Sequence, residues 1–217
     1  MKLLQKAFSI LRRLPFTILL ILVLVLIAFA TSTHTQPLSI DWLNVLGFGP
    51  HDLWYLRLER LLTSAFVTQG GRGFWGALGM LAVSVGLAEW LAGTLRAVVT
   101  FFGVHICTLL IESLLIGLVQ PFNNQQALAL FMVRDVGPSA GYIGCLGLAC
   151  AYLPTSWRWL GAGIIIGILT VALFIPAQAG EDKLVKFSAD AAHVLAFPIG
   201  FASAWIKTDR TLNQQER

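Results

Sequence analysis

The chain has 217 residues, of which 57% are hydrophobic and 12% are charged, and its formal net charge is +4. Soluble domains carry about 25% charged residues, so this composition excludes an ordinary soluble protein and indicates a polytopic membrane protein. No polar stretch is long enough for a separate soluble domain. The basic residues are scattered rather than gathered in a groove with aromatic residues, so we expect no nucleic-acid partner.

Six apolar segments follow one another along the chain, and most approach the length that a bilayer core of about 30 Å requires. They predict an all-α polytopic membrane protein with one six-helix membrane domain over residues 1–217. The predicted spans are residues 14–30, 74–91, 97–119, 139–153, 159–176 and 189–206, with an outer loop at about 31–72. Basic residues are more frequent on the side of both chain ends, which favours cytoplasmic N- and C-termini.

The outer loop and the third span contain notable polar and aromatic residues. Several aromatic residues in the loop suggest that it lies at the membrane interface, with a short amphipathic helix over Leu53–Phe66. His105 and Glu112 are seven residues apart in the third span and so fall on one helix face. They are expected to form a buried polar contact, and a proton path is the alternative.

The fourth predicted span is short and begins at a serine. At about 1.5 Å per residue it covers about 22 Å, so the helix is expected to begin inside the membrane under a water-filled cavity. Ser139 at its start is either a helix-packing residue or a nucleophile. Pro138 fits the first helical position. The N–H groups of Ser139 and Ala140 would then point out of the helix start, where an oxyanion could accept hydrogen bonds from them.

His193 lies about one turn into the sixth predicted span, which runs in the same direction as the fourth. Ser139 and His193 are therefore expected at similar depth, where the imidazole could take the serine proton. Asp190 precedes His193 by three residues and could orient the imidazole, or it could be a solvated acid near the helix cap. Asp135 could cap the fourth helix or pair with Arg134.

The three cysteines, Cys107, Cys145 and Cys150, lie in apolar segments without the spacing of a metal site. We expect them to be buried hydrophobic residues. The sequence contains no HExxH motif. We therefore expect no metal and no cofactor.

These motifs resemble the rhomboid superfamily of intramembrane serine proteases. Gly137-Pro138-Ser139-Ala140-Gly141 resembles its GxSx nucleophile motif, and Ala192-His193 with Gly200 resembles its AHxxGxxxG-type helix. Glu89–Gly93 resembles its ExxxG signature, and Asp135–Ser139 resembles the DVGxS motif of a bacterial rhomboid-like subgroup. The resemblance covers roughly residues 55–206. It implies a six-helix rhomboid-like bundle in the bacterial inner membrane, with Ser139 and His193 as the catalytic dyad and Gly137 and Ala140 at the oxyanion site.

The chain departs from the family at the oxyanion site. The family's HxxxN positions fall on Gly73 and Ala77, which have no side-chain donor, and loss of one oxyanion donor costs about 10²–10³ in turnover. The possible substitutes are Gln69, Arg72 and Asn123. Two functions follow. One is a protease that cleaves transmembrane proteins in the lipid bilayer, and the alternative is an inactive rhomboid-like protein that binds membrane-protein partners as an accessory subunit.

Overall fold

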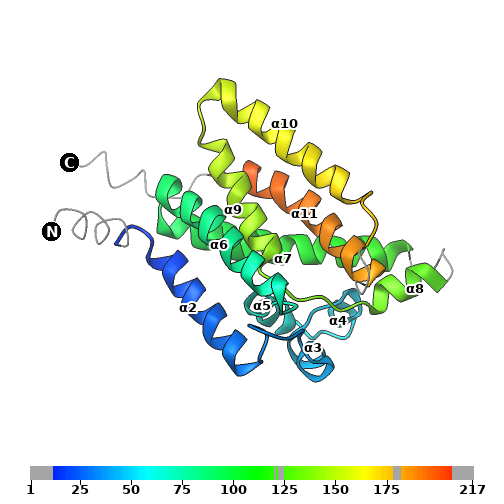
Figure 1. Cartoon of the computed structure of the whole chain (residues 1–217). Helices are drawn as coiled ribbons and strands as arrows, with labels where there is room; N and C mark the ends of the chain where they lie inside the picture. The colour runs from blue at the N-terminus through cyan, green and yellow to red at the C-terminus, as the bar shows by residue number, and fades with distance from the viewer. Residues whose placement is uncertain (1–11, 120, 122–124, 178–181, 207–217) are drawn as a thin grey trace.

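The computed structural model describes residues 12–119, 121, 125–177 and 182–206 (Figure 1). Within these ranges the chain is mostly helical and has no β-strand, only two isolated bridges. This confirms the all-α prediction for the described part of the chain. Its helices are α2 (Pro15–Ala30), α3 (Ile40–Leu46), α4 (Pro50–Trp54), α5 (Arg60–Thr63), the 3-10 turn η1 (Ser64–Phe66), α6 (Arg72–Ala92), α7 (Thr94–Val119), α8 (Gln125–Met132), α9 (Ser139–Ala151), α10 (Thr155–Ala172) and α11 (Lys183–Ser203).

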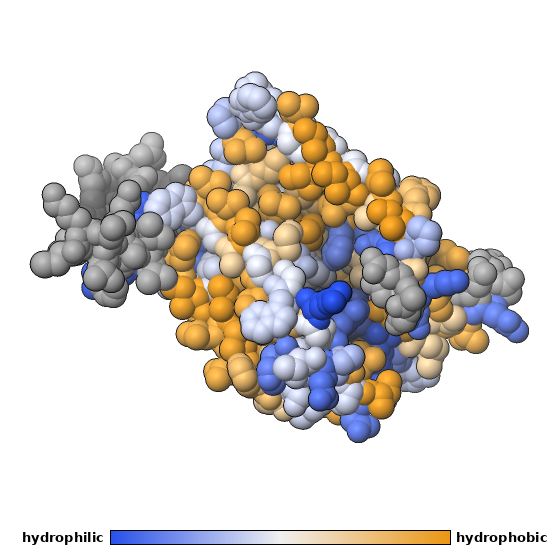
Figure 2. All heavy atoms as spheres, in the orientation of Figure 1, coloured by the Kyte–Doolittle hydropathy of each residue, from blue (hydrophilic) through white to orange (hydrophobic). Residues whose placement is uncertain are grey.

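Among these, α6, α7, α10 and α11 are long and apolar enough to cross a membrane. The helices α2 and α9 are apolar but shorter, with 16 and 13 residues. Hydrophobic side chains gather over α2 and α10, whereas hydrophilic and hydrophobic side chains are mixed over the segment from α3 to α5 (Figure 2). The described chain is thus a helical protein with a membrane-compatible surface and an amphipathic segment at one end.

The short helix α9 is the centre of the bundle (Figure 1). Ten of its 13 residues are buried, and it packs against α6, α7 and α11. Glycines let the backbones of α9 and α11 touch, because a Cβ at Gly147 would lie 2.3 Å from the Phe197 carbonyl oxygen. A Cβ at Gly200 would lie 2.0 Å from the Gly144 carbonyl oxygen. Small residues at these positions are therefore required for the close approach of the two helices.

The helix α10 differs from α9 because it has no buried residue. It contacts only the outer side of the bundle, through α9 and α11, and lies at the top of the view in Figure 1. It begins at Thr155, four residues before the predicted start of the fifth span at residue 159. Pro154 at its N-cap supplies the extended residue that precedes the helix.

The helix that contains the sixth predicted span begins six residues before the predicted start at residue 189. The helix α11 begins at Lys183 because the Asp182 side chain caps it, accepting the Leu184 N–H at 2.8 Å and the Val185 N–H at 3.3 Å. The ammonium of Lys186 donates to the Ala172 carbonyl oxygen at 3.1 Å, which ties the first turns of α11 to the end of α10. His193 consequently lies near the middle of the helix rather than one turn into it.

Two further expectations are corrected. Leu53–Phe66 is not one amphipathic helix, because α4 ends at Trp54 and Leu56 adopts a positive φ of 56° before α5 begins. Cys107 is exposed on α7, whereas Cys145 and Cys150 are buried as expected. A cysteine on an apolar helix face is buried only when another helix covers that face. The hydropathy pattern does not show which faces are covered, so the exposure of Cys107 could not be predicted from it.

Candidate functional site

Ser139 and His193 line the same cavity, which has a volume of about 200 Å³. The cavity lies at the amino-terminal end of α9, between α6, α9 and α11, beneath the loop that precedes Ser139. Its walls include Gly73 and Ala77 of α6, Ser139 and Tyr142 of α9, and Ala189 and His193 of α11. The structure therefore brings both candidate catalytic residues and both departures from the family motif to one place.

Ser139 is the first residue of α9, and Pro138 is the N-cap rather than the first helical residue as predicted. No side chain caps this helix, and its first hydrogen bond runs from the Tyr142 N–H to the Pro138 carbonyl oxygen at 2.9 Å. The N–H groups of Ser139, Ala140 and Gly141 precede that bond, so they have no acceptor within the helix. They and the helix dipole make this helix start favourable for an anion.

The backbone before Ser139 is held in a defined path. Gly137 has a φ of 152°, which favours glycine, and its N–H donates to the Ser64 carbonyl oxygen at 2.9 Å. Asp135 and Phe48 exchange two backbone hydrogen bonds of 2.9 and 3.0 Å. The loop leading to Ser139 is thereby attached to the segment from α3 to η1.

The His193 imidazole has a buried nitrogen without a hydrogen-bond partner. Its Nε2 is buried and has no hydrogen-bond partner, and its Nδ1 lies 3.9 Å from Asp190 Oδ1. No hydrogen bond joins Ser139 and His193, although both are described residues of the same cavity. A buried ring nitrogen without a partner is uncommon in proteins and calls for an explanation.

Asp190 is shared between two cationic or potentially cationic groups. It pairs with Lys186 one turn earlier, and its distance of 3.9 Å from the His193 ring exceeds hydrogen-bond length. The interpretation of Asp190 as an acid near the helix cap is wrong, because Asp182 caps α11. The Asp190 carboxylate can still attract a positive charge on the imidazole through space.

Gly73 and Ala77 leave the cavity without the two side-chain donors of the family motif. Of the proposed substitutes, Gln69 lines the cavity, but its amide donates to Asp135 Oδ1 at 2.9 Å. Arg72 does not line it, and Asn123 lies outside the described residues.

Thr68 was not predicted as a site residue, although it lines this cavity and its buried hydroxyl has no hydrogen-bond partner. The available signal was its place four residues before the start of α6, close to Gly70 and Gly71, which both have a positive φ. Thr68 therefore brings a hydroxyl without a partner to the wall of a cavity in which Gly73 and Ala77 supply no side-chain donor.

Asp135 neither caps α9 nor pairs with Arg134, which corrects both predicted interpretations. Its Oδ1 accepts the Gln69 amide at 2.9 Å and the Val136 N–H at 2.7 Å. Burial raises the pKa of the Asp135 carboxyl, and these two hydrogen bonds oppose that shift.

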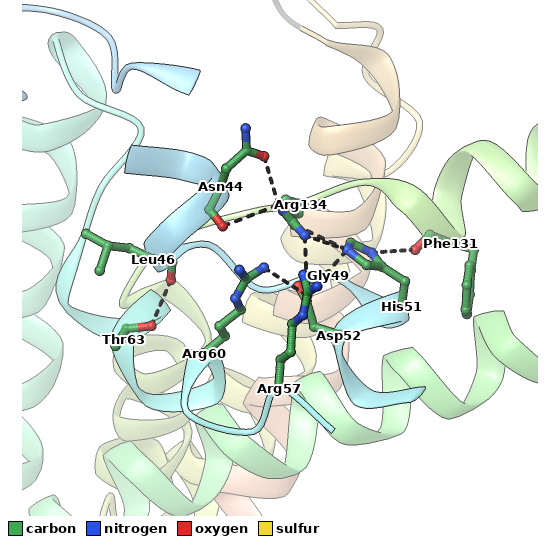
Figure 3. Close-up of polar contacts among 10 residues, drawn as sticks. All are labelled: Asn44, Leu46, Gly49, His51, Asp52, Arg57, Arg60, Thr63, Phe131 and Arg134. Atoms are coloured by element: carbon green, nitrogen blue, oxygen red, sulfur yellow. Dashed lines mark hydrogen bonds and ion pairs between the residues drawn. The ribbon is translucent and has the colours of Figure 1, made fainter. Parts of the chain in front are cut away.

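Arg134 belongs instead to a cluster that we call the Asp52 cluster, formed by His51, Asp52, Arg57, Arg60 and Arg134 (Figure 3). The Asp52 carboxylate is fully buried, and its Oδ1 lies 2.9 Å from Arg60, 3.4 Å from Arg134 and 3.6 Å from Arg57. Arg134 also donates to the Asn44 side chain at 2.8 Å. The cluster therefore attaches α3, α4 and α5 to the loop that leads to Ser139.

His51 in this cluster accepts a hydrogen bond at Nε2 from Arg134 at 2.9 Å. Its Nδ1 faces the Phe131 carbonyl oxygen at 3.2 Å, so the network assigns the proton to Nδ1 of a neutral imidazole. Burial lowers the pKa of His51, and the neighbouring Arg134 and Arg57 lower it further, against the opposing effect of Asp52. The Arg134 contact thus depends on an uncharged His51.

His105 and Glu112 do not pair with each other. His105 Nε2 contacts the Ser64 hydroxyl at 3.3 Å, and Glu112 Oε1 accepts the Ser188 hydroxyl at 2.5 Å. Both residues line a smaller cavity of about 30 Å³, which also borders Ser139. The expected contact between His105 and Glu112 is therefore wrong, and each of the two is a buried polar residue with its own partner.

Comparisons with known proteins identify no relative: no protein-family model, no curated protein and no solved structure matches the chain. The fold and the cavity define a helical chain with membrane-compatible helices and a serine and a histidine in one recess. Any more specific function has to be argued from that geometry and from the motifs.

Proposed function

We propose that this chain is a rhomboid-type intramembrane serine protease that cleaves transmembrane proteins in the bacterial inner membrane. The observation that carries the proposal is the cavity shared by Ser139 and His193 at the uncapped start of α9. The free Nε2 of His193 supports it, because a general base needs an accepting nitrogen.

The reaction begins when the Ser139 oxygen attacks the carbonyl carbon of the substrate peptide bond. The serine proton moves to His193 Nε2. The tetrahedral oxyanion accepts hydrogen bonds from the N–H groups of Ser139 and Ala140 and from the Thr68 hydroxyl. His193 then gives its proton to the departing amine, which leaves an ester on Ser139. Water attacks the ester, again losing a proton to His193, and the acid product leaves as Ser139 regains its hydrogen.

The absent Ser139–His193 hydrogen bond is compatible with this mechanism, because catalytic hydrogen bonds often form only in the substrate complex. The nearby Asp190 carboxylate stabilises the imidazolium that forms each time His193 takes a proton. The serine is the nucleophile, the imidazole moves the protons and the N–H groups bind the oxyanion, so the mechanism calls for no metal or cofactor.

The proposed six-span topology includes the shorter helices α2 and α9. The burial of α9 supports this, because a helix enclosed by α6, α7 and α11 does not have to match the lipid thickness itself. Both termini would lie in the cytoplasm. Much of the basic sequence behind this orientation, including Lys2 and Lys6, lies outside the described residues.

The alternative is a proteolytically inactive rhomboid-like protein that binds membrane partners. The two positions Gly73 and Ala77 favour it, because they supply no side-chain donor to the cavity that they line. On this alternative, Ser139 would only help α9 to pack, and the cavity would have no chemical role.

A fluorophosphonate probe on the purified protein separates the two functions. We expect labelling of wild type, none of Ser139→Ala, and labelling about 10²–10⁴-fold slower for His193→Ala, since its general base is lost. Ser84→Ala is the matched control, because it removes another buried, unpartnered hydroxyl in α6 away from the cavity. Cleavage of a transmembrane reporter should follow the same order. If Ser139-dependent labelling and cleavage of the reporter are both absent, the inactive alternative holds.

The role of Thr68 has its own test in the same assay. Thr68→Val keeps the shape and removes the hydroxyl, so we expect kcat to fall about 10²–10³-fold with little change in KM. Thr68→Ser should restore most of the rate. Equal rates for Thr68→Val and wild type would show that the oxyanion is held by backbone groups alone.

A further inference from the structure

A second recess lies on the lipid-facing side of the bundle, between α7 and α11 and towards the carboxyl end of α9. It has a volume of about 180 Å³, and we call it the α7–α11 groove. Its apolar walls include Val99 and Cys107 of α7, Ile199 of α11, Ile206 just after α11, and Leu148 of α9 at its base. It lies away from the candidate site, because Ser139 is at the opposite end of α9.

The groove is elongated along α7. Arg96, Val99, Gly103 and Cys107 are spaced three or four residues apart, so they share one helix face over about 16 Å of its length. A Cβ built on Gly103 meets no atom within 4 Å, so the groove is open at its middle. A narrow apolar groove that runs along a membrane helix has the shape of an extended hydrocarbon chain.

The polar groups inside the groove are already occupied. The Thr100 hydroxyl contacts the Ser203 hydroxyl at 3.2 Å, and the Ser203 hydroxyl donates to the Gly200 carbonyl oxygen at 2.6 Å. These bonds join α7 to α11 at the base of the groove. The interior therefore offers contact surface to an apolar group and little hydrogen-bonding capacity to a polar one.

The mouth of the groove is basic. Arg96 lines it, and Tyr152 accepts a hydrogen bond from the guanidinium of Arg96. Arg13, whose guanidinium lies 5.0 Å from the centre of the Trp90 ring, and Arg158, which donates to the Leu153 carbonyl oxygen, do not line the groove. Among the described residues, Glu89 is the acid at this end of the bundle, and it is buried.

We propose that the α7–α11 groove binds an anionic glycerophospholipid, with one acyl chain in the groove and its phosphate at Arg96. Basic pockets between membrane helices bind anionic head groups, and the apolar groove selects an attached hydrocarbon chain. A free phosphate lacks the hydrocarbon chain that the groove would hold, and a zwitterionic lipid such as phosphatidylcholine carries its phosphate beside a compensating positive charge. The inference does not depend on proteolysis, so its test is independent of catalytic activity.

The first test is native mass spectrometry of the full chain with phosphatidylglycerol or phosphatidylcholine in mild detergent. We expect wild type to retain phosphatidylglycerol in preference, and Gly103→Phe to lose that lipid because the ring fills the groove. Gly163→Phe on α10 is the matched control, because its Cβ also meets no atom within 4 Å. Arg96→Gln should lower the preference for phosphatidylglycerol about fivefold, and Arg96→Lys should restore it.

A second measurement uses wild-type protein and so does not depend on whether a variant folds. Exposed Cys107 lines the groove, whereas Cys145 and Cys150 are buried. Its reaction with a membrane-permeant maleimide should slow when phosphatidylglycerol replaces phosphatidylcholine in nanodiscs. Equal lipid retention by Gly103→Phe and Gly163→Phe, or equal retention of the two lipids by wild type, would overturn the proposal. Unchanged Cys107 reactivity would also count against it.

Discussion

Two buried carboxylates attach the amino-terminal part of the chain to the helical bundle, and their surroundings are opposite in kind. Asp52, on the side of the candidate site, lies among three guanidinium groups and His51. Glu89, at the far end of α6, accepts only neutral groups: the Phe16 N–H at 2.9 Å, the Thr17 N–H at 2.8 Å, and the hydroxyls of Thr17 at 2.7 Å and Thr94 at 2.9 Å. Both carboxylates are at most 2% exposed.

The difference shows two ways of keeping a buried negative charge. Glu89 replaces the missing side-chain cap of α2, so the N–H groups and dipole of that helix start stabilise it. Asp52 is stabilised by the full charges of arginines, two of which lie in the segment from α4 to α5 (Figure 3). The Arg57 side chain among them is exposed to solvent. We therefore expect the Asp52 cluster to respond to loss of charge and to protonation of His51, and the Glu89 contact to respond to loss of its hydrogen bonds.

The largest effect is expected for Asp52→Asn. It leaves Arg60 and Arg134, with side chains only 13% and 17% exposed, without their carboxylate. Breaking a buried ion pair from one side costs about 3–5 kcal/mol, so the thermal unfolding midpoint in lipid nanodiscs should fall clearly. Asp41→Asn is the control, because Asp41 is an exposed acid on α3. A fall no larger than that of the control would contradict the importance of the cluster.

The same comparison shows what could be predicted from the sequence. The bounds of α6 and α7 were predicted to within three residues, because long apolar runs end at Gly93 and at the polar stretch after Val119. The Asp52 cluster could not be predicted, since Arg134 is 82 residues from Asp52 along the chain. In the sequence its members also have the pattern of solvated charged residues in a loop, and only the folded structure brings them together.

The candidate site was predicted better than its surroundings. Motif positions place Ser139, His193, Gly73 and Ala77 in one region, and the structure brings them to one cavity. The partnerless Thr68 hydroxyl was missed, because hydrogen-bond satisfaction depends on packing and not on residue type. The start of α11 was missed because lysines and acids in its first turns follow the pattern of a solvated loop.

A smaller loss is expected for Glu89→Gln. The amide oxygen can still accept, but the amide NH₂ group faces donors and leaves them unpaired, which costs about 1–3 kcal/mol. Glu59→Gln serves as control, since Glu59 is exposed. Thermal unfolding of Glu89→Gln should lie between that of wild type and that of Asp52→Asn. A greater loss than in Asp52→Asn would reverse the ranking of the two carboxylates and show that neutral donors matter more than the ion cluster.

The smallest effect, and the sharpest distinction between the two carboxylates, is the response to acid. Burial lowers the folded-state pKa of His51 below its usual value of 6.5, so the unfolded chain binds its proton first as pH falls. The stabilising effect of neutral His51 is therefore complete above that value and is lost as pH falls through it. The unfolding midpoint should be lower at about pH 5.5 than at about pH 7.5.

His51→Gln is the informative variant, because an amide can accept from Arg134 and donate to Phe131 without titrating in this range. Its unfolding midpoint should change less with pH than that of wild type, whatever its absolute stability. Glu89→Gln should keep the part of the pH dependence that arises from His51, since the described donors to Glu89 are backbone N–H groups and hydroxyls and not His51. If His51→Gln and wild type lost the same stability on acidification, the acid response would arise elsewhere. The two carboxylates would then differ in strength of attachment but not in sensitivity to pH.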